Sequence, residues 1–177
     1  MIELDTAVED DGWTALGDAE ALARRAVEAA LAAASVPGPV SASLLLTDDT
    51  AVRALNREWR GQDKSTNVLS FPAPPGAAAP GSVGAPRHLG DVVLAFETVA
   101  REAAADGKPL ADHATHLLVH GVLHLVGHDH ESEGDAAAME ALEVAVLAGL
   151  GIADPYGDAP PRSPEPTPLD VKAVPPP

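Results

Sequence analysis

Two segments near the start of the chain are predicted to be strands, and apolar and polar residues alternate at the start of the second. They cover residues 2–8 and 40–46. Between them, the alanine-rich run ALARRAVEAALAAA begins near Asp18 and ends before Pro37-Gly38-Pro39. An aspartate cap followed by strong helix formers and a proline stop predicts a helix. The chain therefore starts with a strand, a helix and a second strand.

The rest of the chain continues this mixture of helical and extended patterns. Apolar residues at helical spacing indicate a helix whose buried face carries Val52, Leu55 and Trp59. Ser132 and Asp135 approximate a capping box for a final helix that buries Met139, Leu142 and Val146. Between these two helices the patterns predict a strand over residues 67–71, a surface loop over 72–88, a strand over 91–96, and helices over 97–105 and 109–127.

The predicted helix over residues 109–127 is apolar on nearly every side from Leu117 onward, apart from its histidines. A helix of this kind is normally central and buried. Polar rings on a buried helix destabilise the fold unless they have partners. The histidines of this helix are therefore the first place to look for chemistry.

The distribution of prolines predicts where the folded domain ends. Nine of the seventeen prolines fall after residue 154, in a segment without apolar periodicity. We expect one folded domain over residues 1–154 and a disordered proline-rich tail over residues 155–177.

The formal net charge is −16, yet four of the eleven basic residues lie within twelve positions: Arg53, Arg57, Arg60 and Lys64. A local basic surface on an acidic protein is expected.

Composition also limits the metal ligands and the compartment. The chain has no cysteine, so a transition metal would be bound by nitrogen and oxygen atoms. No stretch reaches about 18 consecutive apolar residues, and the first residues lack the basic and apolar regions of a secretory leader. We expect a soluble cytoplasmic protein without a membrane partner.

Five of the seven histidines lie within fifteen residues. His120 and His124 are four residues apart, so they project from one face of a helix. Gly127 can end the helix in a left-handed conformation and let His130 return as a third nitrogen ligand. Three imidazoles and one open position are typical of catalytic zinc, so we predict one zinc ion per chain.

The remaining histidines have other interpretations. Isolated histidines are usually exposed or hydrogen-bonded core residues, and we expect this of His88, His113 and His116. His128 leaves the same turn as the three ligands. Its sequence position is compatible with a proton shuttle, a substrate contact or simple exposure.

The histidine spacing matches the metzincin protease signature H-E-x-x-H-x-x-G-x-x-H, with one difference. Gly121 stands where those enzymes carry the glutamate that takes a proton from the attacking water. A metzincin-like peptidase would need another carboxylate, such as Asp91 or Asp129. A zinc-dependent hydrolase of a different substrate is kept as the alternative function.

The segment HGVLHLVGHDH, with LNREWRGQDKSTNVLSFP and LGDVVLA upstream, resembles the YbeY family of bacterial endoribonucleases. The motifs occur in the family's order over residues 40–150. The resemblance implies a single-strand-specific, metal-dependent endoribonuclease that matures the 3′ end of small-subunit ribosomal RNA and acts in ribosome quality control. It implies zinc ligands at His120, His124 and His130, and a role in RNA cleavage or binding for Arg60. The family commonly has tyrosine at the position of His128.

We predict an α+β fold, with a small mixed sheet of about four strands and helices packed around a central zinc-bearing helix, as the resemblance also implies. Arg60 and His120 are assigned to catalysis, because a guanidinium can hold a phosphate in two hydrogen bonds. Lys64 and Asn67 are weaker candidates for substrate binding, although Asn67 and Ser70 are equally able to cap the strand. Asp91 is expected either to orient a ligand imidazole or to cap a turn.

The expected partners are ribosomal RNA and the small ribosomal subunit, with no DNA and with a monomer favoured. The acidic surface predicts modest, salt-sensitive RNA binding. A third hypothesis is a non-enzymatic ribosome-assembly factor whose zinc is structural.

Overall fold

A four-stranded sheet forms one layer of the computed structural model, which describes residues 1–75 and 84–157. The strand order is β1-β2-β4-β3. β1 and β4 are both parallel to β2, whereas β3 is antiparallel to β4, so the sheet is mixed as predicted. The strands are β1 (Ile2–Val8), β2 (Val40–Thr47), β3 (Val68–Pro72) and β4 (Arg87–Ala95).

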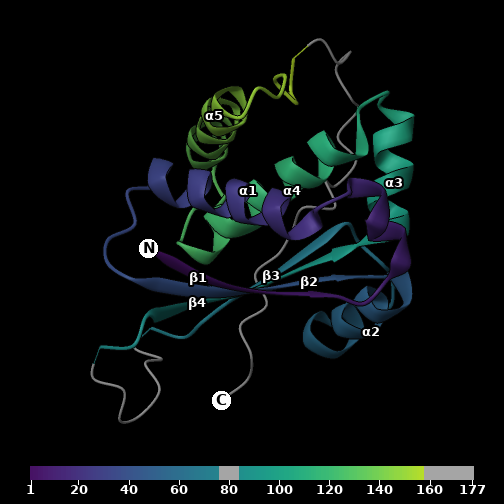
Figure 1. Ribbon diagram of the computed structural model, residues 1–177, viewed down its shortest axis with the longest axis horizontal. Helices are drawn as coiled ribbons and strands as arrows, with labels where there is room; N and C mark the ends of the chain where they lie inside the picture. The colour runs from purple at the N-terminus through teal and green to yellow at the C-terminus, as the bar shows by residue number, and fades with distance from the viewer. Residues whose placement is uncertain (76–83, 158–177) are drawn as a thin grey trace.

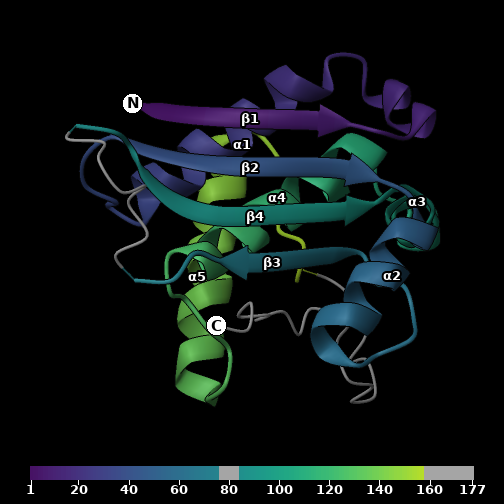
Figure 2. The same ribbon diagram turned by 90° about the horizontal axis from the view of Figure 1, so that it is seen from below.

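Most helices lie on one face of this sheet (Figure 1). Their bounds are α1 (Ala19–Ala33), α2 (Asp49–Arg60), α3 (Phe96–Ala105), α4 (Leu110–Leu125) and α5 (Glu133–Gly149). α2 lies on the opposite face and extends past the β3 edge of the sheet (Figures 1 and 2). This arrangement confirms the predicted small α+β domain. None of the helices in the described ranges combines the length and the apolar content needed to cross a membrane.

α4 is the central helix, as its sequence pattern predicts. From His113 to Leu125 every residue is buried. The helix packs against α1, α3 and α5 and against strands β3 and β4. Because it has neighbours on every side, its polar side chains must find partners inside the protein.

β4 is longer than predicted, because its first residues pair with β2. Arg87 and His88 oppose Val40 and Ser41, so the predicted loop is wrong at its C-terminal end. Gly90 has φ of 128° where the register with β2 shifts. A Cβ atom at this position would lie 2.1 Å from the Phe71 carbonyl oxygen, which only glycine avoids. Residues 76–83 of the predicted loop lie outside the described residues.

A short 3-10 helix, η1 (Asp11–Leu16), was not predicted. It buries Trp13 completely, and the indole Nε1–H donates to the Thr47 carbonyl oxygen at 3.0 Å. The ring packs edge-on against Phe96, 5.3 Å away. Six residues are too few to show a helical period, so no sequence pattern revealed this element.

Candidate metal centre

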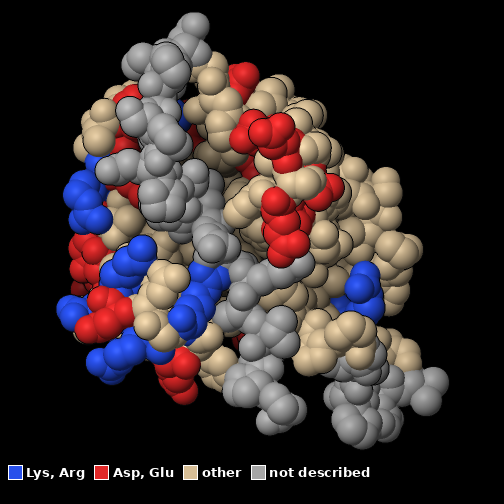
Figure 3. All heavy atoms as spheres, turned by 180° about the vertical axis from the view of Figure 1, so that it is seen from behind, with Lys and Arg blue, Asp and Glu red and all other residues tan. Residues whose placement is uncertain are grey.

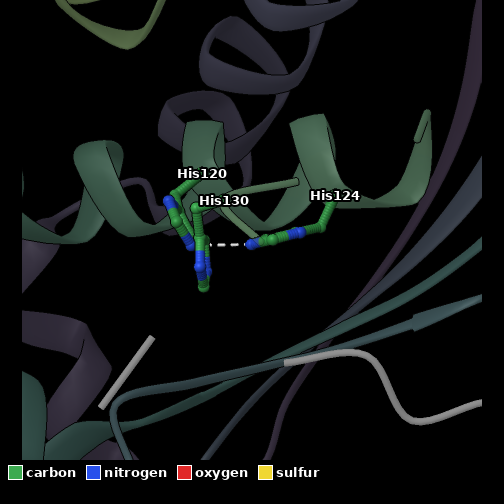
Figure 4. Close-up of side chains that lie close together, drawn as sticks. All are labelled: His120, His124 and His130. Carbon is green, nitrogen blue, oxygen red and sulfur yellow. Dashed lines mark hydrogen bonds between the residues drawn. The ribbon is translucent and has the colours of Figure 1, made fainter. Parts of the chain in front are cut away.

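Three histidine rings converge at the C-terminal end of α4. His120, His124 and His130 each offer a ring nitrogen, and these nitrogens all lie within 4.8 Å of one another. Figure 4 shows the rings pointing toward one another, with His120 and His124 one helical turn apart. His120 and His124 are buried and His130 is half-buried. The structure thus brings together the three residues that the spacing selected.

The turn after α4 returns His130 to the helix, as predicted. Gly127 has φ of 97°, the left-handed region in which glycine is favoured. Its N–H donates to the His124 carbonyl oxygen at 3.1 Å, and the His128 N–H donates to the Leu123 carbonyl oxygen at 3.0 Å. These bonds satisfy carbonyl groups at the helix end while the chain reverses. The His130 ring then lies 5.1 Å from the His124 ring.

The donor set fits a metal ion. Nε2 of His120 and Nε2 of His124 face each other at 3.0 Å. The other nitrogen of His120, Nδ1, lies 2.5 Å from the Glu143 carboxylate, which can only accept a hydrogen bond when ionised. The hydrogen of a neutral His120 ring is therefore on Nδ1, and the lone pair of Nε2 points into the cluster. Neutral imidazoles with converging lone pairs are ligands for zinc and related metals.

Burial keeps His124 in this neutral form. Desolvation, and after it the charges of His120 and His130, lower the pKa of His124 to about 4. The ring is therefore uncharged at neutral pH. A metal ion and a proton compete for the same lone pair, so a lowered pKa favours the metal.

Glu143 on α5 is a member of the site that sequence analysis missed. Its side chain is fully buried and contacts His120, His116 and Tyr156. Burial alone raises the pKa of a carboxyl group, but the hydrogen bonds from His116 and His120 outweigh it and lower the pKa of Glu143 to about 2. The only signal in the sequence was a glutamate on the buried side of α5, next to Leu142.

Acid is expected to destabilise the metal-free chain, because His124 and Glu143 both have a lowered pKa in the folded state. His124 has a folded-state pKa below its ordinary value of 6.5, so its contribution is complete above that value and falls as the pH drops toward 4. The lowered pKa of Glu143 adds a further loss between 4.5 and about 2. Urea denaturation of metal-free protein at about pH 7 and about pH 5 measures the effect. Equal free energies of unfolding at both pH values would contradict this assignment.

His113 and His116 are hydrogen-bonded core residues, as predicted. His113 Nε2 lies 2.8 Å from Glu102, and His116 Nε2 lies 3.0 Å from Glu143, so both are hydrogen-bonded core residues. His88 is half-buried beside Ser41, 3.2 Å away. His128 is half-buried in the turn after α4.

Asp91 does not orient a histidine of the cluster, which was the first of the two roles expected for it. It is exposed on β4, and its neighbour Val92 is the residue that faces α4. Successive side chains of a strand point to opposite faces, so Asp91 lies on the other side of the sheet. There it lines a cavity of about 480 Å³ with Trp59 and Phe71, away from the histidines.

Gly121 lies where α4 approaches the sheet most closely. A Cβ atom there would be 2.8 Å from Val92 Cγ1 and 3.1 Å from Ser70 Oγ. Ser70 Oγ–H donates to the Gly121 carbonyl oxygen at 3.1 Å, so Ser70 joins β3 to α4. The glutamate of the protease signature has no room at this position.

Asn67 holds three elements together. Its Nδ2 donates to Glu102 of α3 at 3.1 Å, and its Oδ1 accepts from the Val68 N–H at 2.7 Å. Glu102 in turn contacts His113 of α4. The side chain is 4% exposed. These contacts favour the structural interpretation of Asn67, and its role in substrate binding stays a prediction.

The basic residues selected from the sequence have different surroundings. Arg53 is bound to Asp63 through two hydrogen bonds of 2.9 Å, so its charge is offset. Arg60 is half-buried at the end of α2. Lys64 is exposed, and its carbonyl oxygen accepts from Asn56 Nδ2 at 2.8 Å. Arg60 and Lys64 thus lie at the end of α2 and just after it, whereas the three histidines lie on α4 and in the turn after it.

β3 lies between the end of α2 and the histidine-bearing part of α4. Trp59, the neighbour of Arg60, packs edge-on against Phe71 of β3 at 6.2 Å. The opposite face of β3 carries Ser70, which contacts α4 one residue from His120. The end of α2 and the histidine-bearing part of α4 therefore flank the same edge strand.

Comparison with known proteins agrees with this geometry. The family model described as Endoribonuclease YbeY matches residues 8–151, most of the chain. The chain belongs to the YbeY family. An endoribonuclease YbeY of Azorhizobium caulinodans is 55% identical over 88% of this chain and 96% of that protein. Another, of Paramagnetospirillum magneticum, is 54% identical over 89% of this chain and 97% of that protein.

A solved structure supports the fold. The solution structure of a Thermotoga maritima protein has a TM-score of 0.54 and covers 91% of this chain and 99% of that chain, at 22% identity. Membership in the YbeY family identifies an RNA-cleaving hydrolase and does not favour the peptidase alternative.

Proposed function

We propose that this protein is a zinc-dependent, single-strand-specific endoribonuclease that matures the 3′ end of small-subunit ribosomal RNA and acts in ribosome quality control. The observation that carries the proposal is the convergence of His120, His124 and His130 within 4.8 Å in a chain of the YbeY family. Three histidines without thiolates suit a catalytic ion with one open position.

The residues of the chain would divide the work between them. His120, His124 and His130 would hold the ion, which when bound supplies a Lewis acid and an activator of water. Arg60 would hold a phosphate of the RNA through its planar guanidinium and stabilise charge that develops there during cleavage. No carboxylate of the protease type is required for this division.

The surface charge supports the proposal that a partner presents the RNA to this protein. Figure 3 shows basic side chains gathered at the α2 end of the molecule, with acidic side chains among them, and a group of acidic side chains elsewhere on that face. The net charge is −16. Such a surface favours weak, salt-sensitive RNA binding, so we propose that the small ribosomal subunit positions the RNA. Tight binding to free RNA at high salt would contradict this proposal.

Cleavage of purified single-stranded RNA and of casein, each with and without a chelator, tests the reaction class. We expect cleavage of RNA alone, lost with the chelator and restored by zinc. Cleavage of casein without cleavage of RNA would establish the peptidase alternative instead.

Arg60→Lys is expected to reduce RNA cleavage about tenfold, because an ammonium cannot form the paired hydrogen bonds of a guanidinium. Zinc content should not change. Arg53→Lys is the matched control on the same helix. The Arg53 guanidinium is engaged with Asp63 and has no assigned role toward RNA, so RNA cleavage should stay at the wild-type rate.

Normal cleavage by the Arg60→Lys protein would remove Arg60 from the mechanism. If, in addition, His124→Ala unfolded the protein while RNA processing in cells survived Arg60→Glu, the structural-zinc assembly factor would become the better hypothesis.

A further inference from the structure

Glu143 is a carboxylate with no exposure to solvent and with three hydrogen-bonding neighbours. Its Oε1 lies 2.5 Å from His120 Nδ1, and its Oε2 lies 3.0 Å from His116 Nε2. The Tyr156 hydroxyl donates to the same Oε2 atom. A buried carboxylate is costly unless its lone pairs are occupied, and here three donors from two other elements occupy them.

The contact with His120 determines which ring nitrogen can bind a metal. An ionised carboxylate accepts hydrogen bonds and cannot donate them, so His120 must carry its hydrogen on Nδ1. Nε2 then presents its lone pair toward His124 Nε2, 3.0 Å away. The opposite tautomer would place a hydrogen where the ion would bind. Glu143 therefore selects the ligand form of His120 and holds its ring in place.

Tyr156 holds Glu143 from the C-terminal side. Its ring packs edge-on against His116 at 5.6 Å, and the backbone carbonyl of the preceding Pro155 accepts from Lys108 Nζ at 3.2 Å. Pro155 and Tyr156, which the sequence analysis assigned to the tail, thus contact Lys108 and Glu143. Residues 158–177 lie outside the described residues.

A second carboxylate–histidine pair on α4 provides an internal comparison. His113 Nε2 lies 2.8 Å from Glu102 of α3. Glu102 also accepts from Asn67, and its side chain is 28% exposed. His113 is not part of the metal cluster. The Glu102–His113 pair joins α3 to α4, whereas Glu143 contacts His120, one of the three proposed metal ligands.

We propose that Glu143 is the positioning residue of the metal centre and that Tyr156 fixes Glu143, so the segment after α5 adjusts metal affinity. The inference rests on the proposed binding of metal by His120, His124 and His130. Carboxylates behind metal-binding histidines typically change metal affinity about 10- to 100-fold.

Zinc affinity of the full chain, measured by competition with a chromophoric chelator, tests the proposal. Glu143→Gln keeps the shape of the side chain and removes its charge, and we expect about 10- to 100-fold weaker zinc binding. Tyr156→Phe should weaken binding in the same direction by a smaller factor. Glu102→Gln is the matched control, and its zinc affinity should equal that of the wild type.

Nitrogen NMR of the metal-free wild type gives a readout that a purely structural role would not produce. We expect the His120 ring to carry its hydrogen on Nδ1, and this population to fall in Glu143→Gln. A folded Glu143→Gln protein with wild-type zinc affinity would overturn the proposal, as would hydrogen on Nε2 of His120 in the wild type.

Failure of the metal site and failure of this inference give different results. A wild-type chain that binds no zinc overturns the proposed metal site. If the wild type binds zinc and Glu143→Gln does not fold, two other measurements test the inference. They are the zinc affinity of Tyr156→Phe and the tautomer of His120 in the wild type. Either wild-type affinity in Tyr156→Phe or hydrogen on Nε2 of wild-type His120 would then overturn the inference.

Discussion

Replacing His124 with alanine is expected to remove zinc from the purified protein and to abolish RNA cleavage. His124 is 1% exposed, and its Nε2 faces the lone pair of His120 at 3.0 Å. Without it two imidazoles remain, one of them half-buried, and a catalytic zinc site requires three protein ligands. Metal analysis of the wild type should give about one zinc per chain and of the variant none. His120→Ala and His130→Ala should behave in the same way.

The matched control for this experiment is His113→Ala. His113 is a buried histidine of the same helix, and its partner is Glu102 and not the cluster. This variant should be less stable, because Glu102 loses a hydrogen-bond donor, yet it should keep its zinc. Full zinc content in His124→Ala would refute the assignment of the metal centre.

Valine at position 121 is expected to destabilise the fold by about 3 kcal/mol, at the upper end of the usual cost of overpacking a core. The Cβ atom alone would lie 2.8 Å from Val92 Cγ1 and 3.4 Å from Val68 Cγ2, and both neighbours are buried in the sheet. α4 cannot move away without losing the hydrogen bond from Ser70 to the Gly121 carbonyl oxygen. Chemical denaturation measures the difference in free energy of unfolding.

Gly149→Val, at the end of α5, is the control for this substitution. No atom lies within 4 Å of the position that its Cβ would occupy, so we expect a change within about 0.5 kcal/mol. Equal stability of Gly121→Val and the wild type would show that α4 has freedom to move from the sheet. The absence of the protease glutamate would then have no steric explanation.

The histidine cluster could be predicted because it depends on local geometry. The helical period places His120 and His124 on one face, and a glycine turn of a few residues returns His130. Each step involves neighbours in sequence, so the spacing carries the information. The strands and most helices were predictable for the same reason, since their periods are local.

Three features could not be obtained in this way. Glu143 is 23 residues from His120 in sequence, and its contact depends on how α5 packs on α4. Trp13 is buried by a helix too short to have a period. Asp91 was considered for the metal centre because of its place at the start of a predicted strand. The pairing of β4 with β2 places it on the face of the sheet away from α4.

The sequence by itself determined an α+β chain with a buried helix and three histidines that can converge, because periodicity, glycine conformation and side-chain chemistry are properties of short segments. The tertiary structure decided which carboxylate contacts His120, how closely position 121 approaches the sheet, and that Tyr156 contacts Glu143. These facts depend on the packing of α5 and the sheet against α4. Contacts between distant segments are set by the fit of whole surfaces, which no local pattern encodes.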